Sequence, residues 1–243
     1  MIAPTTTLGE LVVENPARSR VLEKFGLDYC CGGKATLGEA CARKALPVDS
    51  VVRELDASDA TYRRTPLDGR GPGDWSLTEI VDHIERTHHD YLRAELPRLS
   101  GLLDKVVRAH GDNSPYLHTL RDTFEPFRAD LEQHMAKEEK VLFPWIRRNE
   151  ATGTGGVSLA SLGNPIAVME AEHEDAGAAL EEFRALTNGY VAPPTACGTF
   201  RALLDALATL EQDMHRHVHL ENSVLFPRAL GGKVGGGGGG GAA

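Results

Sequence analysis

Apolar residues recur every three or four positions over most of the chain after Gly73. This spacing places them on one face of an α-helix, and few segments show the period-two alternation of a β-strand. We therefore expect an all-α fold with four long helices, at about residues 76–109, 115–148, 165–186 and 195–225. Short connections between long helices favour antiparallel neighbours, so the four should form an up-down bundle.

Prolines and glycines mark where these helices begin, bend or stop. Pro115 and Pro165 suit a first helical turn, where the missing N–H costs nothing. The glycine-rich residues 151–163 and the segment 188–194 should separate the later helices. Three further prolines lie inside the helical pattern and should kink or end helices locally: Pro97, Pro126 and Pro144.

A leading region precedes the bundle. Two S/T-x-x-E capping boxes there, Thr7–Glu10 and Thr36–Glu39, share the sequence Thr-Leu-Gly-Glu and predict two short helices. A third box, Ser76–Glu79, precedes the first bundle helix. With the Pro- and Gly-rich stretch as a linker, we expect a small helical cysteine domain at 1–64, a linker at 65–73, the bundle at 74–232 and a disordered Gly-rich tail at 233–243.

Composition narrows the class of protein. The chain has 243 residues, 41% hydrophobic and 25% charged, which is typical of a soluble globular protein. Its net charge of −9 argues against nucleic acid or an anionic membrane as the main partner. The N-terminus lacks the apolar core of a signal peptide and no stretch reaches membrane-spanning length. Four cysteines are too few for a disulfide framework, so we expect a cytoplasmic protein.

Ionisable residues interrupt the apolar stripes of two helices. A buried, unpaired carboxylate is costly, so these residues must share partners, protons or a cation. The second helix carries the stripe Leu117, Leu120, Phe124, Phe127, Leu131, His134, Glu138, Val141 and Trp145. The fourth carries Phe200, Leu203, Leu207, Leu210, Met214, His217, Glu221 and Val224 or Leu225.

The two helices repeat one motif. His134-x-x-x-Glu138 and His217-x-x-x-Glu221 are both followed, after two residues, by Val-Leu-Phe-Pro. At positions i and i+4 the imidazole and the carboxylate lie one above the other on the same helix face. Each pair can therefore reach a shared cluster in the bundle core.

Each copy of this motif has an upstream histidine at nearly the same separation. His173 lies on the apolar stripe of the third helix, between Met169 and Leu180. On the first helix, apolar periodicity alone fits His88 as well as His89. The matching separation and the acidic residue that follows favour His89. The chain thus contains two copies of a helix with a histidine followed by a helix with His-x-x-x-Glu.

Six ligands of this kind, four imidazoles and two carboxylates, exceed what one tetrahedral zinc ion needs. Two carboxylates can bridge two cations, with two imidazoles on each cation and an oxide, hydroxide or water completing the bridge. Imidazole with carboxylate suits iron, with manganese and zinc as competitors. We therefore expect two non-heme iron ions, oxo- or hydroxo-bridged, held by His89, His134, Glu138, His173, His217 and Glu221.

These motifs, together with Asp28-Tyr29-Cys30-Cys31-Gly32-Gly33 and Met169-Glu170-x-Glu172-His173, resemble the iron–sulfur cluster repair di-iron proteins, the RIC family. Members have a hemerythrin-like bundle behind a short cysteine domain, and the resemblance covers all but the glycine tail. It places the family's iron ligands on the same six residues. Oxygen-carrying hemerythrins have a further histidine where this chain has Met169 or Gly177, so the site should be more open.

The cysteine motif suggests a second chemistry. Adjacent cysteines rarely bridge each other. Gly32 and Gly33 should leave the thiols of Cys30 and Cys31 uncovered, and Lys34 could lower a thiol pKa. The pair could pass on metal, react with nitric oxide or exchange disulfides, or it could be a structural turn with buried thiols. Cys41 and Cys197 should be small core residues.

The remaining ionisable residues are candidates for the ligands' surroundings. Glu172 could be a gate or proton relay, or an ordinary acidic surface residue. Metal-bound imidazoles usually donate their other N–H to a carboxylate or carbonyl, for which Asp82, Asp90 and Glu174 are candidates. Six histidines should be at the surface or beside the ligands: His83, His88, His110, His118, His215 and His219.

The resemblance implies repair of iron–sulfur clusters damaged by oxidative or nitrosative stress, through iron donation, nitric oxide binding or its reduction. It implies iron–sulfur proteins as clients and NO or O₂ as small ligands; nitric oxide reductase activity and a homodimer stay open. The competing hypotheses are a hemerythrin-like O₂ or NO sensor or carrier without repair activity, and an oxidase or peroxidase that uses the same irons. A plain gas carrier has no need of the Cys-Cys-Gly-Gly motif, which favours repair.

Overall fold

The computed structural model describes residues 2–61, 72–152 and 160–231. By contacts, the chain divides into two compact units. One comprises Met1–Ile80, Thr154–Gly163 and Val218–Ala243, and the other comprises Val81–Gly153 and Asn164–His217. Most of the predicted linker and the whole predicted tail lie outside the described residues. Shortly before the first bundle helix, Pro72–Asp74 form a single 3₁₀ turn, η1.

The leading region is helical, as predicted, but it holds four helices rather than two. They are α1 (Leu8–Glu14), α2 (Arg18–Lys24), α3 (Leu37–Arg43) and α4 (Val48–Thr61). The predicted capping boxes are present at Thr7 and Thr36, each with both of its reciprocal hydrogen bonds. α2 has no side-chain cap, which left no capping signal for it in the sequence.

Apolar side chains from these helices form one core, which includes Leu8, Leu11, Leu22, Leu37, Val51 and Leu55. The two repeated Thr-Leu-Gly-Glu segments meet beside it, where Thr7 and Thr36 form an antiparallel β-bridge. That bridge is the sole β pairing in the part of the chain that the structure describes, so the all-α prediction is confirmed.

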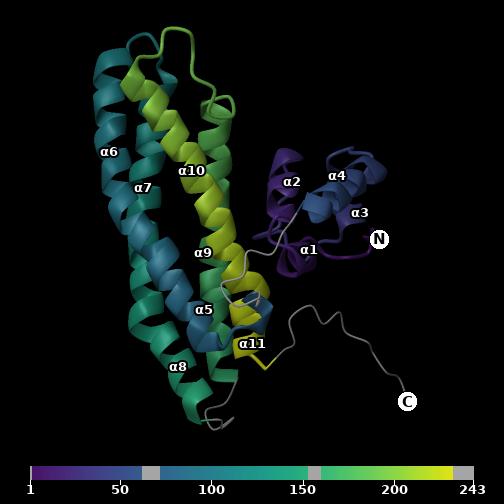
Figure 1. Cartoon of the computed structure of the whole chain (residues 1–243). Coiled ribbons are helices and arrows are strands. Elements are labelled where there is room, and N and C mark those ends of the chain that lie inside the picture. The colour runs from purple at the N-terminus through teal and green to yellow at the C-terminus, as the bar shows by residue number, and fades with distance from the viewer. Residues whose placement is uncertain (1, 62–71, 153–159, 232–243) are drawn as a thin grey trace. The chain divides into compact units, whose positions relative to one another are not determined.

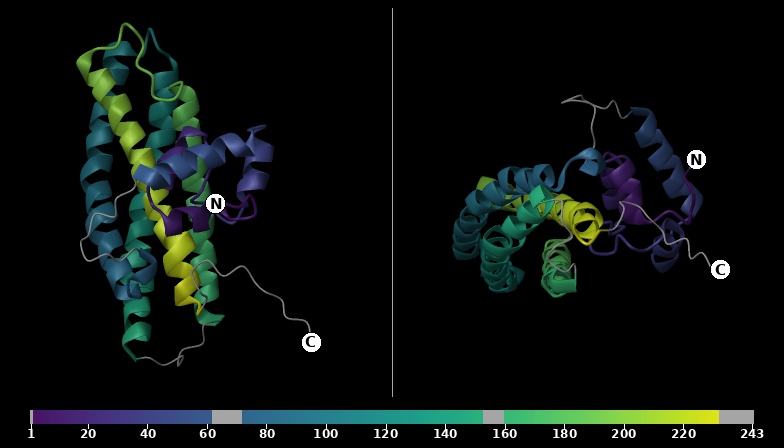
Figure 2. Two further views of the ribbon diagram at one scale, coloured as in Figure 1. Left: turned by 45° about the vertical axis from the view of Figure 1, so that its right-hand side comes forward. Right: turned by 90° about the horizontal axis from the view of Figure 1, so that it is seen from below.

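The predicted four-helix bundle is confirmed (Figure 1). Four long helices lie side by side, each antiparallel to the next, and Figure 2 shows them end-on. They and their shorter extensions are α5 (Leu77–Ile84), α6 (Asp90–His110), α7 (Tyr116–Lys137), α8 (Phe143–Thr152), α9 (Ala160–Leu186), α10 (Gly198–Leu220) and α11 (Phe226–Ala229). None of the described helices is long and apolar enough to cross a membrane.

Prolines have different effects at different positions. Pro115 is the N-cap of α7, close to the predicted helix start. The prediction for Pro165 is wrong, because α9 begins earlier, at Ala160, and Pro165 lies inside it. Pro97 and Pro126 lie inside α6 and α7 without ending them. A proline near a helix start loses few hydrogen bonds, and packing of the apolar stripe keeps the longer helices intact.

The break predicted at 188–194 is confirmed between α9 and α10. Three consecutive residues there, Asn188, Gly189 and Tyr190, have positive φ angles of 50°, 71° and 63°. Glycine and asparagine tolerate this left-handed conformation, which ends a helix.

Candidate metal centre

Three π-helical turns interrupt the bundle helices: η2 (Glu85–His89), η3 (Glu138–Leu142) and η4 (Glu221–Leu225). In each, the backbone N–H of the residue after the turn donates to the carbonyl five residues earlier, as Phe143 does to Glu138 and Phe226 does to Glu221. Each turn begins or ends on a predicted metal ligand. Single π turns inside α-helices are rare, and those that are observed lie frequently at functional sites.

The π turn changes which residues face inward. After Glu138 the predicted stripe continues to Val141, but Val141 is 64% exposed and Leu142 and Phe143 are buried instead. A π turn inserts one extra residue, so the stripe moves on by one position. The prediction for Val141 is therefore wrong, and Trp145 is only half-buried. On the equivalent helix both Val224 and Leu225 are buried.

The six predicted ligands come together in two groups that share both carboxylates. One group is His89, His217, Glu138 and Glu221, and the other is His134, His173, Glu138 and Glu221. Within each group the ligand atoms lie within 4.8 Å of one another, and all six residues are buried. The arrangement offers two imidazole nitrogens to each of two neighbouring positions, with both carboxylates available to both.

Distances between the ring nitrogens fit a shared cation. Nε2 of His89 lies 3.3 Å from Nε2 of His217, and Nε2 of His134 lies 3.1 Å from Nε2 of His173. Two imidazoles bound to one ion at about 2.1 Å, with a bond angle near 90–100°, would have their nitrogens about 3 Å apart. Each pair is therefore spaced to bind one ion.

The carboxylate of Glu138 gives an independent test. It is fully buried, and neither oxygen accepts a hydrogen bond from the residues that the structure describes. Oε2 lies 3.3 Å from Nε2 of His89 and 3.5 Å from Nε2 of His134, one imidazole from each group. A buried carboxylate without donors is costly, so the site fits a cation that both oxygens can bind.

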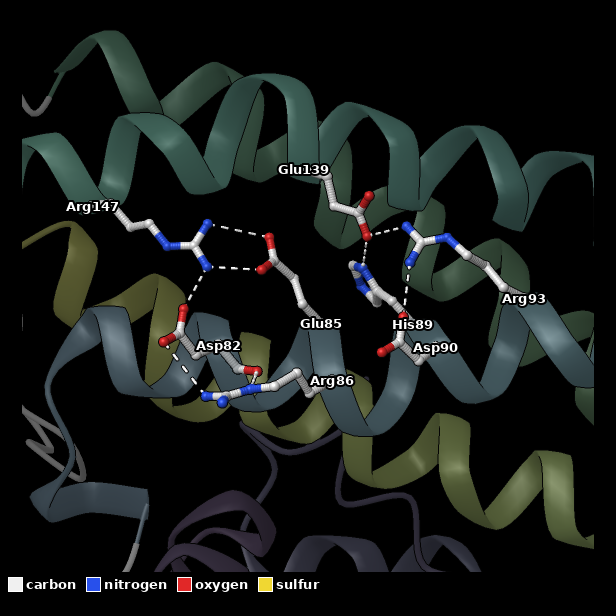
Figure 3. Close-up of polar contacts among 8 residues, drawn as sticks. All are labelled: Asp82, Glu85, Arg86, His89, Asp90, Arg93, Glu139 and Arg147. Atoms are coloured by element: carbon white, nitrogen blue, oxygen red, sulfur yellow. Dashed lines mark hydrogen bonds and ion pairs between the residues drawn. The ribbon is translucent and has the colours of Figure 1, made fainter.

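The outer nitrogen of His89 is fixed by a carboxylate. Nδ1 lies 2.7 Å from Oε1 of Glu139, which also accepts a hydrogen bond from Arg93 (Figure 3). A carboxylate can only accept here, so Nδ1 carries the proton and Nε2 presents its lone pair to the group. Burial raises the pKa of Glu139, but its bonds to His89 and Arg93 outweigh burial and leave that pKa below its usual value.

A second ion-pair network lies one turn away. Arg147 of α8 donates to Glu85 at 2.8 Å and to Asp82 at 2.6 Å (Figure 3). It thus joins the helix that carries His89 to the helix that carries Glu138. The carboxylate of Asp90, meanwhile, accepts from Arg93 on its own helix.

His134 has a matching partner. Its Nδ1 lies 2.8 Å from Oε2 of Glu172, and Lys137 donates to the other oxygen of the same carboxylate. Partial burial raises the pKa of Glu172, but the bonds from Lys137 and His134 outweigh it, so the pKa lies below its usual value. Glu172 therefore stays ionised and orients the imidazole of His134 toward the group.

His88 and His89 face different partners. His88 is buried, but its Nδ1 lies 2.9 Å from Asp213, and its ring stacks on that of His217 at a centroid distance of 5.2 Å and an interplanar angle of 1°. His88 therefore supports the ring of His217 from outside the group, whereas His89 belongs to the group.

A pocket of about 470 Å³ lies between α7 and α9 and reaches His134 and His173. Its wall is partly apolar, with Phe127 among the lining residues, and partly charged, with Lys137 and Glu172. Its size suits a small molecule. The ligands among its lining residues, His134 and His173, both belong to the same group.

The candidates for the ligands' outer partners are mostly wrong. Asp82 and Asp90 pair with arginines, and Glu174 is exposed. Glu172 contacts His134, whereas Glu139, which contacts His89, was not among the candidates. The repeat hid it, because the second copy has Asn222 at the equivalent position. No sequence signal marked Glu139, because its partner His89 lies on another helix, 50 residues away in the chain.

The cysteines differ from the expectation. Cys30 is buried at 6% exposure and Cys31 is half-buried, so the prediction that both thiols are uncovered is wrong for Cys30. A hydrogen bond with Cys31, burial and the charge of Asp28 raise the pKa of Cys30 well above its usual value. Cys41 is buried, as predicted, but Cys197 is exposed.

Of the six histidines expected at the surface or beside the ligands, only two are buried. His88 supports a ligand, as described, and His219 is buried at 5% exposure. The other four are at least partly exposed: His83, His110, His118 and His215.

An antiparallel helical bundle with buried histidines and glutamates in two overlapping groups defines a metal-binding protein of the hemerythrin class. The family described as the hemerythrin HHE cation binding domain matches residues 81–229, and a domain of unknown function, DUF542 or ScdA_N, matches residues 4–59. The chain belongs to the hemerythrin HHE family and carries a DUF542 domain ahead of it.

Curated relatives match along nearly the whole chain. Proteins of Citrobacter koseri, Escherichia coli and Escherichia fergusonii, each named iron-sulfur cluster repair protein YtfE, are 40% identical to it over 229 residues. The alignment covers 93% of this chain and 97% of each relative.

Proposed function

We propose that this protein repairs iron–sulfur clusters damaged by oxidative and nitrosative stress and that its bundle holds two iron ions. The observation that carries the proposal is the pair of buried groups that share Glu138 and Glu221. Relatives named for iron–sulfur cluster repair, aligned over 93% of the chain, support the same activity. The alternative of an O₂ or NO carrier without repair activity is not favoured.

In this proposal His89 and His217 would hold one iron and His134 and His173 the other, with Glu138 and Glu221 available to both. The two ions would be oxo- or hydroxo-bridged. When bound, the iron pair supplies redox-active, exchangeable metal with room for a small ligand such as NO or O₂. The protein's own part is orientation: Glu139 and Glu172 hold the Nδ1 protons of His89 and His134, so that each Nε2 is presented to the metal.

The pocket suggests where a small ligand enters. It reaches His134 and His173, and its partly apolar wall suits an uncharged gas. His89 and His217 are not among the residues that line it. His134 and His173 are therefore the ligands that we expect a small molecule such as NO to reach first.

We further propose the domain organisation 1–64, 65–73, 74–232 and 233–243, as a cysteine domain, a linker, the di-iron bundle and a tail. Iron–sulfur proteins would be the clients, in the cytoplasm. A net charge of −9 disfavours nucleic acid and anionic membrane as partners. The DUF542 match at residues 4–59 supports a role beyond gas binding, because a carrier needs only the bundle.

The test is recovery of an iron–sulfur dehydratase that has been inactivated by nitric oxide. Iron-loaded protein should restore activity, and metal-free protein should not. The variant Glu138→Ala tests the bundle site, with Glu174→Ala as its matched control, because Glu174 is an exposed glutamate next to His173. Recovery with Glu174→Ala but not with Glu138→Ala is expected. No recovery by protein that demonstrably holds two irons would favour the gas-binding alternative.

A further inference from the structure

A turn in the leading region brings three metal-binding side chains together. Sγ of Cys30 lies 3.0 Å from Oδ1 of Asp28 and 3.9 Å from Sγ of Cys31. The donor atoms of all three residues lie within 4.8 Å of one another. None of the three belongs to the bundle site, whose donors are imidazoles and carboxylates.

The backbone holds this turn in shape. The carboxylate of Asp28 accepts hydrogen bonds from the N–H groups of Cys30, Cys31 and Gly32, at 3.0, 3.0 and 2.8 Å. A Cβ atom at Gly33 would lie 2.6 Å from the carbonyl oxygen of Tyr29, so only glycine fits there. The glycines therefore close the turn around Asp28, and the donors are arranged before any ligand binds.

The separation of the sulfur atoms fits a metal better than a disulfide. A disulfide requires about 2.05 Å between them. Two thiolates on one tetrahedral ion, with metal–sulfur bonds of about 2.3 Å, lie about 3.8 Å apart. The observed 3.9 Å is close to that value.

We propose that Asp28, Cys30 and Cys31 form a second metal site, which binds one thiophilic divalent cation. Thiolate ligands select such ions, Fe²⁺ and Zn²⁺ among them, over Mg²⁺ and Ca²⁺. In the repair function proposed above, on which the choice of metal rests, the ion is Fe²⁺. Three protein donors leave one tetrahedral position open, as in metal sites that exchange ligands. The site would thus present a single iron ion to a client protein.

Binding is an exchange of protons for metal. Each of the two thiols loses its proton as its sulfur bonds to the cation, so two protons leave for each divalent ion bound. The S–H hydrogen bond from Cys30 to Asp28 is replaced by bonds of both groups to the ion. The hydrogen bond with Cys31, burial and the charge of Asp28 raise the pKa of Cys30.

The test is cobalt titration of the full-length protein after its bundle has been loaded with iron under anaerobic conditions. Co²⁺ bound to thiolate has an intense sulfur-to-cobalt charge-transfer absorption. The bundle groups contain no sulfur ligand, so this absorption cannot arise there. We expect it to saturate at one Co²⁺ per chain, with release of two protons per ion.

Cys31→Ser is the main variant, because Cys31 is only half-buried and its replacement should preserve the turn. Losing a direct ligand should weaken binding by more than the roughly 10–100-fold typical of a lost outer-shell partner. Cys41→Ser is the matched control: Cys41 is in the core, outside the site, and its variant should bind like wild type. Circular dichroism and the bundle iron count verify that each variant folds.

Absence of the absorption in wild type, or its persistence in Cys31→Ser, would overturn the proposal. Its loss in a folded Cys41→Ser variant would also overturn it, since sulfur binding would then arise elsewhere. These outcomes leave the bundle iron unaffected and therefore do not bear on the repair proposal. Conversely, loss of dehydratase recovery with an intact cobalt site would count against repair alone.

Discussion

Nε2 of His134 lies 3.1 Å from Nε2 of His173, a residue on another helix of the bundle. The Nδ1–H group of His134 donates a hydrogen bond to Glu172, so Nε2 of a neutral His134 presents a lone pair. A cation between the two rings explains why they face each other in a buried site.

This arrangement predicts that Glu138→Ala and Glu221→Ala each release most of the bound metal. Each carboxylate belongs to both groups, so its loss weakens both ions. Each substitution leaves a cavity that should lower the free energy of unfolding by roughly a few kcal/mol, as other large-to-alanine changes in a core do. The bundle should stay helical. Metal analysis and circular dichroism measure the two effects. Metal retention in either variant would show that its carboxylate is not a ligand.

The two adjacent histidines should behave differently. His89→Ala removes a predicted ligand and should strip metal. His88→Ala removes a ring stacked on His217 and a partner of Asp213, but no ligand, and should lower metal content mildly. Iron content after identical loading and desalting decides between them. The opposite ranking would mean that His88 binds the metal and that His89 supports it.

Much of the bundle could be predicted because its sequence repeats. The stripe around His134 and Glu138 recurs around His217 and Glu221. The same spacing of apolar, His and Glu positions would rarely arise twice by chance. In the leading region, helices α1 and α3 had capping boxes and were predicted, while α2 had no cap and was missed. Capping motifs in the sequence thus identified the helices whose N-termini are stabilised by capping side chains.

The site's surroundings could not be read in the same way. A π turn shifts the inward stripe by one residue, and periodicity at 3.6 residues per turn cannot show it, so Val141 was placed inside. Partners such as Glu139 for His89 come from another helix, 50 residues away in sequence. Their pairing depends on how helices pack, which sequence spacing does not encode.

An ion pair in the leading domain gives a stability prediction. Arg18 is 7% exposed, and Asp59 accepts two hydrogen bonds from its guanidinium, at 2.8 and 2.6 Å. Asp59→Asn leaves a buried positive charge undercompensated and should destabilise this domain by about 2 kcal/mol, less than for a fully buried pair. Hydrogen exchange of α1–α4 in the full-length protein measures it.

Glu54→Gln is the matched control, because Glu54 pairs with Lys24 at the surface, where a pair contributes about 0–1 kcal/mol. The hydrogen bond from Arg18 lowers the pKa of Asp59. This contribution is therefore present above the carboxyl's unfolded pKa, near 3.8, and is lost as the pH falls through the lower folded value. Equal protection of the α1–α4 amides from exchange in Asp59→Asn and Glu54→Gln would contradict the stabilising role of the Arg18–Asp59 pair.

Cys197 should be the most reactive thiol near neutral pH. Its Sγ lies 3.3 Å from Nε2 of His110, and this bond together with backbone N–H donors at the start of α10 lowers its pKa to about 7. The rate of its alkylation by iodoacetamide should therefore rise with a midpoint near pH 7. His110→Ala should move that midpoint toward 9, the ordinary value. The buried Cys41 serves as the unreactive control, and a midpoint near 9 in the wild type would refute the His110 contact.

Iron content combined with Mössbauer spectroscopy tests the central claim, that two irons share Glu138 and Glu221. The protein is expressed with ample iron, purified anaerobically and then oxidised. Two irons per chain are expected, one for each of the two overlapping groups, with the spectrum of a spin-coupled, bridged ferric pair. One tightly held zinc per chain, or a single iron with no coupled partner, would contradict the account.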